Sequence, residues 1–418
     1  MQVTIESMAF GGAGIAKNEG KVFFVKGGLP GDTVEINIVK DKGSYAEAII
    51  SEVITPSPNR VNPACAVFDK CGGCQLQRLE YSSQVQEKEN IVSDTLSRIG
   101  GYHKTEIEPI VPSGSPYSYR NRVVLSTWFY AGHWHLGYNQ EKSNRKVAVK
   151  SCPIANEPIN KAIFRLSEVL SSLTDPHYPL DKIYIASNAD HAFITLVPRD
   201  IRKGDSLKTL LKHLQRYEET ELVSVIGKHE ITFGNIILNN TYFLSPSVFV
   251  QANPGINEAM IETVLVWAEL SGTEMVLDLY SGIGNFSIPL ARVSEKVVGV
   301  EINNNAIRLA KSAAEENGIT NITFRNSRSH LIIDEMTANG DTFDLIVLDP
   351  PREGAKELIA GIAELHPAKI IYISCDPATL ARDLKKFGEL GYKLIKVRPF
   401  DMFPQTYHVE TICLLVKS

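Results

Sequence analysis

Cys375 and Glu410, near the end of the chain, have the residue types and positions that covalent chemistry needs. Cys375 follows the apolar segment KIIYIS and precedes the helix-like segment ATLARDLKKF. Because a helix N-terminus stabilises negative charge, we expect this thiol to form a thiolate readily. Glu410 comes just before the last apolar segment, ICLLV, where it could be a general base or, on spacing alone, a capping or ion-paired residue. His408, two residues earlier, is expected to be structural.

A glycine-rich turn indicates a nucleotide-type cofactor. The segment DLYSGIGNF begins at Asp278, where an apolar strand is expected to end, and Glu301 ends the next predicted strand 23 residues later. Glycines in such a turn let the backbone approach a ligand, and a carboxylate at the second strand end can bind ribose hydroxyls. The turn has two glycines, not the three of a dinucleotide fingerprint, so S-adenosylmethionine is favoured over a dinucleotide.

A third strand end carries Asp349, in the segment LDPPR. The carboxyl ends of parallel strands meet at one edge of a sheet, so Asp349, Cys375 and the glycine-rich turn are expected to lie together. A thiolate beside a methyl donor suggests methylation of uracil at C5. The thiolate would add to C6, C5 would take the methyl group, and a base would remove the C5 proton.

Four of the six cysteines form a candidate metal site. Cys65, Cys71 and Cys74 lie within ten residues, and Cys152 follows after 77 intervening residues. Clustered thiols of this kind usually hold zinc or an iron–sulfur cluster, and their spacing leaves these two alternatives open.

Residues 117–150 combine basic and aromatic residues. Six Lys and Arg residues stand against one acid, Glu141, and seven aromatic residues are interleaved with them. This mixture suits RNA, whose phosphates bind cations and whose bases stack on rings. The alternative is a solvated strand face whose rings lie in the core, and we expect some residues of each kind.

The composition limits the possible partners and location. The 418 residues include 43 Lys and Arg against 48 Asp and Glu, a net charge of −5, so any RNA contact must be local. No apolar run approaches the roughly 18 residues that span a bilayer. The first residues, MQVTIESMAF, do not resemble a secretion signal. We therefore expect a cytoplasmic monomer with no membrane partner.

The pattern of elements predicts a multidomain protein. Residues 1–58 alternate apolar and polar positions between glycine-rich turns, which indicates a small β-barrel of the oligonucleotide-binding type. Residues 59–244 are predicted to form a central α+β, RNA-binding domain, with one helix starting at a capping box of Ser83 and Gln86. Residues 245–418 alternate strands and helices, as in a Rossmann-like α/β domain with a doubly wound parallel sheet.

Together these motifs resemble the RNA uracil-C5-methyltransferase family, and most closely its 23S rRNA branch. The resemblance extends over nearly the whole chain. It rests on the cysteine motif and on the segments FGGAGIAK…KVFFVKGGLPGD (similar to a TRAM domain), DLYSGIGNF, LDPPR, SCDPATLARDL and HVE. It implies an S-adenosylmethionine-dependent enzyme that makes 5-methyluridine in 23S rRNA.

The resemblance also implies roles for individual residues. Cys375 would be the nucleophile and Glu410 the proton acceptor. Gln251, with Asn253, matches the family motif F-x-Q-x-N. The implied cofactor and uracil pocket contains Gln251, Tyr280, Asn285, Glu301 and Asp349. The implied ligands of a structural [4Fe-4S] cluster are Cys65, Cys71, Cys74 and Cys152.

Other hypotheses stay open. The tRNA branch of many bacteria lacks both the barrel and the cysteine cluster, but archaeal tRNA enzymes carry both, so tRNA is an alternative substrate. A cytosine-C5 enzyme would share the chemistry but usually has a different cysteine neighbourhood. From another class, a non-catalytic RNA-binding iron–sulfur protein is disfavoured by the complete set of candidate residues. A radical S-adenosylmethionine enzyme would need a C-x3-C-x2-C motif, which is absent from the sequence.

Overall fold

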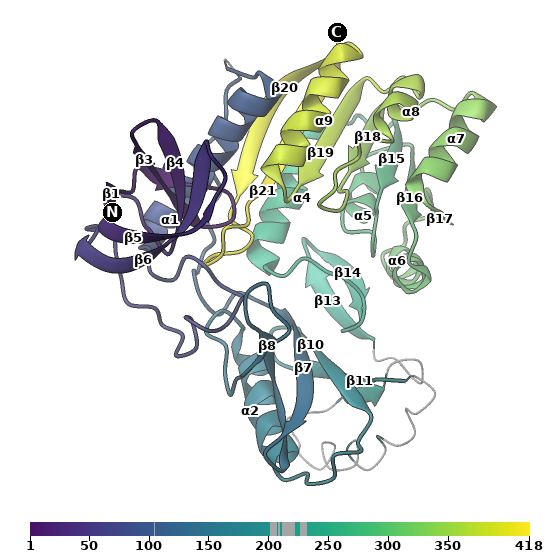
Figure 1. Ribbon diagram of the computed structural model, residues 1–418. Helices are drawn as coiled ribbons and strands as arrows, with labels where there is room; N and C mark the ends of the chain where they lie inside the picture. Colours follow the sequence, from purple (N-terminus) through teal and green to yellow (C-terminus); the bar gives the residue numbers. More distant parts are fainter. Residues whose placement is uncertain (104, 201–206, 208–209, 211–221, 226–231) are drawn as a thin grey trace.

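The computed structural model describes all residues except 104, 201–206, 208–209, 211–221 and 226–231. Among the described residues, three sheets of six or seven strands and one separate hairpin make up the β structure (Figure 1). None of the helices described is both long and apolar enough to span a membrane.

The N-terminal domain is a six-stranded sheet in the order β1-β5-β6-β4-β3-β2. Alternate residues such as Phe23, Val25, Val34 and Ile36 are buried in its own small core, as the alternating sequence pattern predicts. The strand-rich N-terminal domain is thus confirmed. Its strands are β1 (Gln2–Thr4), β2 (Ser7–Met8), β3 (Ala13–Asn18), β4 (Lys21–Lys26), β5 (Thr33–Asp41) and β6 (Tyr45–Thr55).

The central sheet has the order β12-β11-β10-β7-β8-β9. Helix α2 (Glu157–Ser171) covers one face, where Ile159, Ile163 and Leu166 are buried against alternate residues of the strands. The side chain of Asn156 caps this helix by accepting from the N–H of Ile159. The strands are β7 (Arg122–Tyr130), β8 (His133–Asn139), β9 (Lys146–Ala148), β10 (Leu180–Ser187), β11 (Ala192–Pro198) and β12 (Leu222–Val225).

The C-terminal sheet has seven strands in the order β17-β16-β15-β18-β19-β21-β20. The first five strands in this order pair in parallel. Strand β21 is antiparallel to β19, and β20 is antiparallel to β21. This confirms the predicted α/β domain, but the sheet is mixed and not wholly parallel as expected, because the chain returns from β20 to β21 through a loop and not through a crossover helix. The strands are β15 (Met275–Leu279), β16 (Lys296–Glu301), β17 (Ile322–Asn326), β18 (Leu345–Leu348), β19 (Lys369–Ser374), β20 (Tyr392–Phe400) and β21 (Glu410–Lys417).

Helices bury both faces of this sheet, which explains why its strands are continuous apolar runs. Val276 and Leu277 are neighbours in β15, yet each belongs to a different core. The helices with the Val276 core are α4 (Pro254–Ala268), α5 (Ser287–Ala291) and α6 (Asn304–Glu316); those with the Leu277 core are α7 (Ser329–Asn339), α8 (Ile359–Glu364) and α9 (Pro377–Glu389).

Two segments that we assigned to the central domain pack on the C-terminal sheet. Helix α1 (Tyr81–Thr95) and the π-helical turn η1 (Leu96–Gly100) contribute Val92 and Leu96 to the Leu277 core. The hairpin of β13 (Phe233–Ile237) and β14 (Asn240–Leu244) contributes to the Val276 core. The boundary at residue 244 therefore stays a prediction.

The predicted capping box is wrong. Helix α1 starts at Tyr81 with Glu80 as its N-cap, and no side chain caps it, so Ser83 is already inside the helix. Gln86 donates instead to Asn90, one turn later. Tyr81 fixes this end of the helix by a different route, because its hydroxyl accepts from the N–H of Ser113 at 2.8 Å.

Candidate active site

The carboxyl ends of β15 and β18 bring together two of the predicted site residues. The strands pair in parallel with Leu279 beside Leu348. Tyr280 and Asp349, the next residue on each strand, therefore leave the sheet side by side. This is the edge at which α/β sheets bind ligands.

Glu301 holds the glycine-rich turn in place. Its two carboxylate oxygens accept from the N–H of Gly282 at 3.1 Å and the N–H of Asn303 at 2.7 Å. Tyr280 begins the turn with a φ of +65°, an unusual value for a residue with a side chain. The conformation of the turn therefore depends on the hydrogen bond from its backbone to the Glu301 carboxylate at the end of the adjacent strand.

Two side-chain amides are fixed beside the turn. Asn285 and Asn257 exchange hydrogen bonds in both directions at 2.9 Å. Gln251 Nε2 donates to Asp349 Oδ2 at 3.4 Å. Asn253 of the same motif is structural, because it caps α4 and donates to Ser113 Oγ at 3.0 Å. Asn257 was missed in the sequence, since nothing local marks it as the partner of Asn285.

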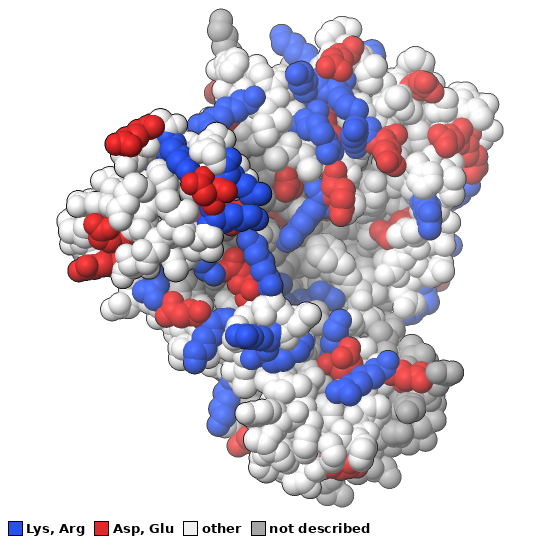
Figure 2. Space-filling view, in the orientation of Figure 1, with Lys and Arg blue, Asp and Glu red and all other residues white. Residues whose placement is uncertain are grey.

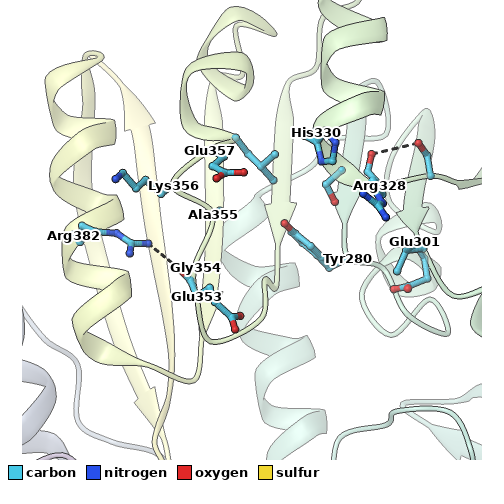
Figure 3. A pocket seen from close by; sticks show the side chains of 14 residues that line it. Tyr280, Glu301, Arg328, His330, Glu353, Gly354, Ala355, Lys356, Glu357 and Arg382 are labelled. Carbon is cyan, nitrogen blue, oxygen red and sulfur yellow. Dashed lines mark hydrogen bonds between the residues drawn. The ribbon is translucent and has the colours of Figure 1, made fainter.

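Two cavities meet at Tyr280. The larger, of about 420 Å³, has several charged residues in its lining, and in Figure 3 Tyr280 lies between Glu301 and Arg328 on one side and Lys356 and Arg382 on the other. The smaller, of about 60 Å³, is lined by Gln251, Asn285 and Asp349 among others.

The smaller cavity has unused hydrogen-bonding capacity. It is also lined by Asn121 and Ser281, and both Asn121 Oδ1 and Ser281 Oγ are buried without a partner. Buried polar atoms are rarely left unsatisfied. Together the two cavities fit a ligand with a polar, nucleoside-like end at Glu301 and a second polar end beside Asp349.

Buried carboxyl groups dominate the electrostatics of this edge. Burial raises the pKa of Asp278 to about 7, with further contributions from Asp349 and Glu301. Ser287 donates a short hydrogen bond to Asp278 that partly offsets the effect. Burial also raises the pKa of Asp349 to about 7. A cation bound here would relieve this repulsion.

Cys375 and Glu410 lie on adjacent strands at the same edge. Strand β19 pairs antiparallel with β21, with Ser374 opposite Thr411, so the thiol and the carboxyl follow at the next positions. Burial, followed by the charge of Asp349, raises the pKa of Glu410 to about 8. The sheet register therefore brings a thiol and a carboxyl together.

The expectation of a readily formed thiolate at Cys375 is wrong. Burial raises the pKa of this thiol to about 12, with smaller contributions from Glu410 and Asp349. The helix N-terminus does not compensate, because the carboxylate of Asp376 already accepts from the N–H groups of the first turn of α9. The thiol is thus protonated at neutral pH in the free protein.

The positive charge of Arg352 opposes these shifts at both Cys375 and Glu410. Its charge lowers the pKa of the Cys375 thiol and of Glu410. Its Nη2 donates to Nε2 of His408 at 3.1 Å. Burial, then Arg352, lowers the pKa of His408 to about 4, so the imidazole is neutral and acts as an acceptor. These contacts agree with a structural role for His408. They also make Arg352 a candidate site residue, which was not predicted from the sequence.

The four clustered cysteines line a second site. Cys65, Cys71, Cys74 and Cys152 surround one cavity of about 230 Å³. Burial raises the pKa of Cys74 to about 12, and the three other thiols add to it. Gly72 lets this segment approach the turn after β8, because a Cβ there would meet the backbone of Glu141 at 2.8 Å.

The thiols surround a space rather than converging on a point. In the part of the chain that the structure describes, no three His, Cys, Asp or Glu side chains are close enough to hold a single metal ion. Four thiols are the donor set that an iron–sulfur cluster takes, and these four line one cavity.

The aromatic residues of the basic stretch divide as expected. Trp134 is buried, whereas Tyr130 is 69% exposed and Trp128 is stacked on His135 at 5.6 Å. Trp128 and Tyr130 lie on the face of the central sheet opposite α2, because their neighbours in β7 form the core with α2. Figure 2 shows Lys and Arg side chains around a hollow at the centre of the molecule, despite the acidic total charge.

Comparison with protein families agrees with this geometry. A family model described as tRNA (Uracil-5-)-methyltransferase matches residues 80–418. The chain belongs to the RNA uracil-C5-methyltransferase family. A TRAM domain model matches residues 1–50, which identifies the strand-rich N-terminal domain.

Individual relatives extend over the whole chain. A Clostridium tetani protein named as an uncharacterized RNA methyltransferase is 37% identical, over 98% of this chain and 95% of its own length. The 23S rRNA (uracil(1939)-C(5))-methyltransferase RlmD of Hahella chejuensis is 32% identical, over 99% of this chain and 96% of its own.

A solved structure supports the fold. Pyrococcus abyssi tRNA (uracil-54, C5)-methyltransferase, solved with S-adenosyl-L-homocysteine, aligns over all of both chains with a TM-score of 0.73 and 24% identity. The family match makes this chain an RNA methyltransferase and supports S-adenosylmethionine as its methyl donor.

The influence of Glu410 on the thiol can be measured without RNA. Because the carboxylate raises the pKa of Cys375, Glu410→Gln should speed alkylation of Cys375 by iodoacetamide at pH 9, about ten-fold for each unit by which the pKa falls. Peptide mass spectrometry isolates this cysteine from the others. Glu389→Gln, an exposed change on α9, is the matched control and should leave the rate unchanged. Equal rates for both variants would contradict the electrostatic coupling.

Proposed function

We propose that this protein methylates C5 of a uridine in 23S rRNA, with S-adenosylmethionine as methyl donor. The observation that carries the proposal is the meeting of a thiol, Cys375, and a carboxyl, Glu410, beside the Tyr280 cavities in a member of this family. The full-length likeness to a 23S rRNA enzyme favours rRNA over tRNA. We further propose that it acts in the cytoplasm, where such RNA is found.

The cofactor site is assigned to the residues around the two cavities. Glu301 would bind the ribose hydroxyls, and Tyr280 and Asn285 would line the path between the cavities. Asp349 and Gln251, which hydrogen-bond each other, would face both the sulfonium and the uracil ring. The positive sulfonium supplies the methyl group.

The protein's own groups account for the remaining steps. The thiol proton of Cys375 passes to water, and the sulfur adds to C6 of uracil, which breaks the C5–C6 double bond and makes C5 nucleophilic. C5 takes the methyl group as the bond from that methyl to the donor sulfur breaks. The ionised Glu410 then removes the proton from C5, the C6–S bond breaks, and the double bond re-forms.

The ionisation states of Cys375 and Glu410 suit this order of addition, methyl transfer and proton removal. A thiol with a pKa of about 12 is unreactive in the free protein, so it is protected from stray alkylation until substrate arrives. Glu410, with a pKa of about 8, can both accept and release a proton near neutral pH.

Two variants test the assignment of nucleophile and base. With unmodified 23S rRNA, wild type should form 5-methyluridine, Cys375→Ala should form none while still binding S-adenosylmethionine, and Glu410→Gln should accumulate a covalent protein–RNA adduct. Mass spectrometry of the RNA and denaturing gels measure product and adduct. Activity in Cys375→Ala would rule out the covalent route. Product only with tRNA would keep the mechanism and change the substrate.

The open face of the central sheet is proposed to hold RNA beside the target uridine. Arg122, at the start of β7, is one residue from Asn121 in the small cavity, and Trp128 and Tyr130 follow along the strand. The outward positions of β7 and β10 also include Lys182, which pairs with Ser126. Exposed rings with nearby cations favour a stacked, single-stranded nucleic acid.

Trp128→Ala should therefore weaken RNA binding. We expect a loss of about 1–3 kcal/mol in binding free energy, the usual value of one stacked base, with unchanged affinity for S-adenosylmethionine. Filter binding of labelled rRNA fragments and calorimetry measure the two affinities. Phe164→Ala, which removes a half-exposed ring from α2 on the opposite side of the sheet, is the control. Equal losses for both variants would refute this face as the RNA site.

We propose that the cysteine cavity holds a [4Fe-4S] cluster with a structural role. The support is the set of four thiols around one cavity and the resemblance of their spacing to that of the family. A cluster would tie the segment before α1 to Cys152 and so to the central domain.

Anaerobically purified protein should contain about four iron atoms and four sulfides per chain. Cys74→Ser should lose most of both, whereas Cys375→Ala, a change outside the cavity, should keep them. Metal analysis and a sulfide assay measure the content. Zinc in a stoichiometric amount, without sulfide, would show instead that the four cysteines bind zinc, the alternative that their spacing leaves open.

A further inference from the structure

The loop of residues 401–409 leads from β20 into Glu410. It carries His408 near its end, and two of its polar residues, Asp401 and Gln405, are 0% and 2% exposed. Buried polar groups must find partners in the protein. Glu410 is the first residue of β21 and pairs with Phe400 of β20, so the partners of this loop show what holds the chain that enters this strand.

Helix α1 supplies two of these partners from one face. Gln84 and Lys88, one turn apart, are 1% and 0% exposed. Lys88 Nζ donates to Asp401 Oδ1 at 2.5 Å and to the carbonyl of Phe403 at 3.0 Å. Gln84 Oε1 accepts from the N–H of Gln405, and Gln84 Nε2 donates to Gln405 Oε1, both at 3.0 Å. Burying an ammonium group and an amide is costly, so this face of α1 is specific for the loop.

The segment that follows the cysteines binds the same residues. The N–H groups of Gln75 and Leu76 both donate to the carbonyl of Gln405, at 3.0 and 2.9 Å. Gln84 Nε2 also donates to the carbonyls of Leu76 and Leu79, at 3.1 and 2.7 Å. Gln75 is next to Cys74 in the sequence. One amide thus joins the cysteine segment and the loop before Glu410.

Gln405 itself has an unusual backbone. Its φ is +69°, in the left-handed region that residues with a side chain seldom adopt. Such a conformation persists only where surrounding contacts enforce it. Here these contacts are the bonds from Gln75, Leu76 and Gln84. Loss of them would let residues 405–410 relax to another path.

We propose that Gln84 and Gln405 form a positioning pair that holds the loop entering β21, and that this loop together with the strand pairing of Glu410 keeps the carboxyl beside Cys375. The placement of Glu410 then depends on the order of the cysteine segment. The proposal rests on the proposed function, because it concerns the proton-removal step assigned there. Neither residue contacts a reacting atom. Cys375 is positioned separately, by β19 and the start of α9. Thiol addition should therefore survive a change that disturbs proton removal.

Gln84→Met tests the pair, since it keeps the size of the side chain and removes its hydrogen bonds. We expect turnover to fall about ten- to hundred-fold, with accumulation of the covalent RNA adduct and at most about two-fold change in the affinity for S-adenosylmethionine. Hydrogen exchange should quicken at residues 401–410. Gln86→Met, an exposed position on the same helix, is the matched control and should behave as wild type.

Two further variants extend the test. Gln405→Gly keeps the left-handed backbone and removes the side-chain bonds, and it should reproduce the adduct if Gln84→Met does not fold. Cys74→Ser should quicken exchange at residues 401–410 through the cysteine segment. Unchanged exchange there would overturn the dependence on that segment.

The remaining outcomes are also decisive. Wild-type turnover in Gln84→Met would overturn the pair. A fall in turnover that only follows thermal stability, with no adduct, would show a purely structural role and overturn it as well. If wild type makes no 5-methyluridine in any RNA, the proposed function fails, and exchange at residues 401–410 alone then decides whether the pair holds the loop.

Discussion

The burial of several acidic groups at one edge of one sheet is the constraint on which this site depends. Burial, with a smaller contribution from the charge of Asp349, raises the pKa of Asp278, of Glu410 and of the Cys375 thiol, and burial alone raises that of Asp349. Such groups separate if the backbone allows it. Parallel pairing of β15, β18 and β19, with a core on each face, prevents this. The rigid sheet therefore keeps the acidic groups close together, which favours binding of a cationic ligand. The positive charge of Arg352 offsets only part of this effect.

Sequence motifs predicted the parts of the site that strand ends dictate. The glycine-rich turn, Glu301, Asp349 and Cys375 each follow an apolar run, and parallel pairing alone brings such positions together. The pKa of Cys375 could not be predicted in this way, because it depends on burial and on carboxyl groups from two other strands. The rule that a helix N-terminus stabilises a thiolate was insufficient, because the carboxylate of Asp376 already accepts from the N–H groups at the start of α9.

The pairs that position the site were also invisible in the sequence. Gln84 and Gln405 are 321 residues apart, and Lys88 and Asp401 are 313 apart. Neither pair has a local signature, and a polar residue within a helix normally faces solvent. The same holds for α1 as a whole, which the sequence assigned to the central domain although its apolar face packs on the C-terminal sheet. Chain order therefore predicted the elements better than it predicted their packing.

The N-terminal sheet shares a core with its neighbours. Met8 and Leu29 of that domain are buried together with Leu76, Leu79 and Ile91, and the ring of Phe10 meets Tyr407 edge-on at 5.2 Å. A domain of this size is often regarded as a portable module, joined to different catalytic partners by a linker. Here the interface is continuous with the interior of the catalytic half. A change at Met8, Leu29 or Phe10 therefore also disturbs the packing of α1 and of the loop that carries Tyr407, so this domain cannot be altered independently of the catalytic half.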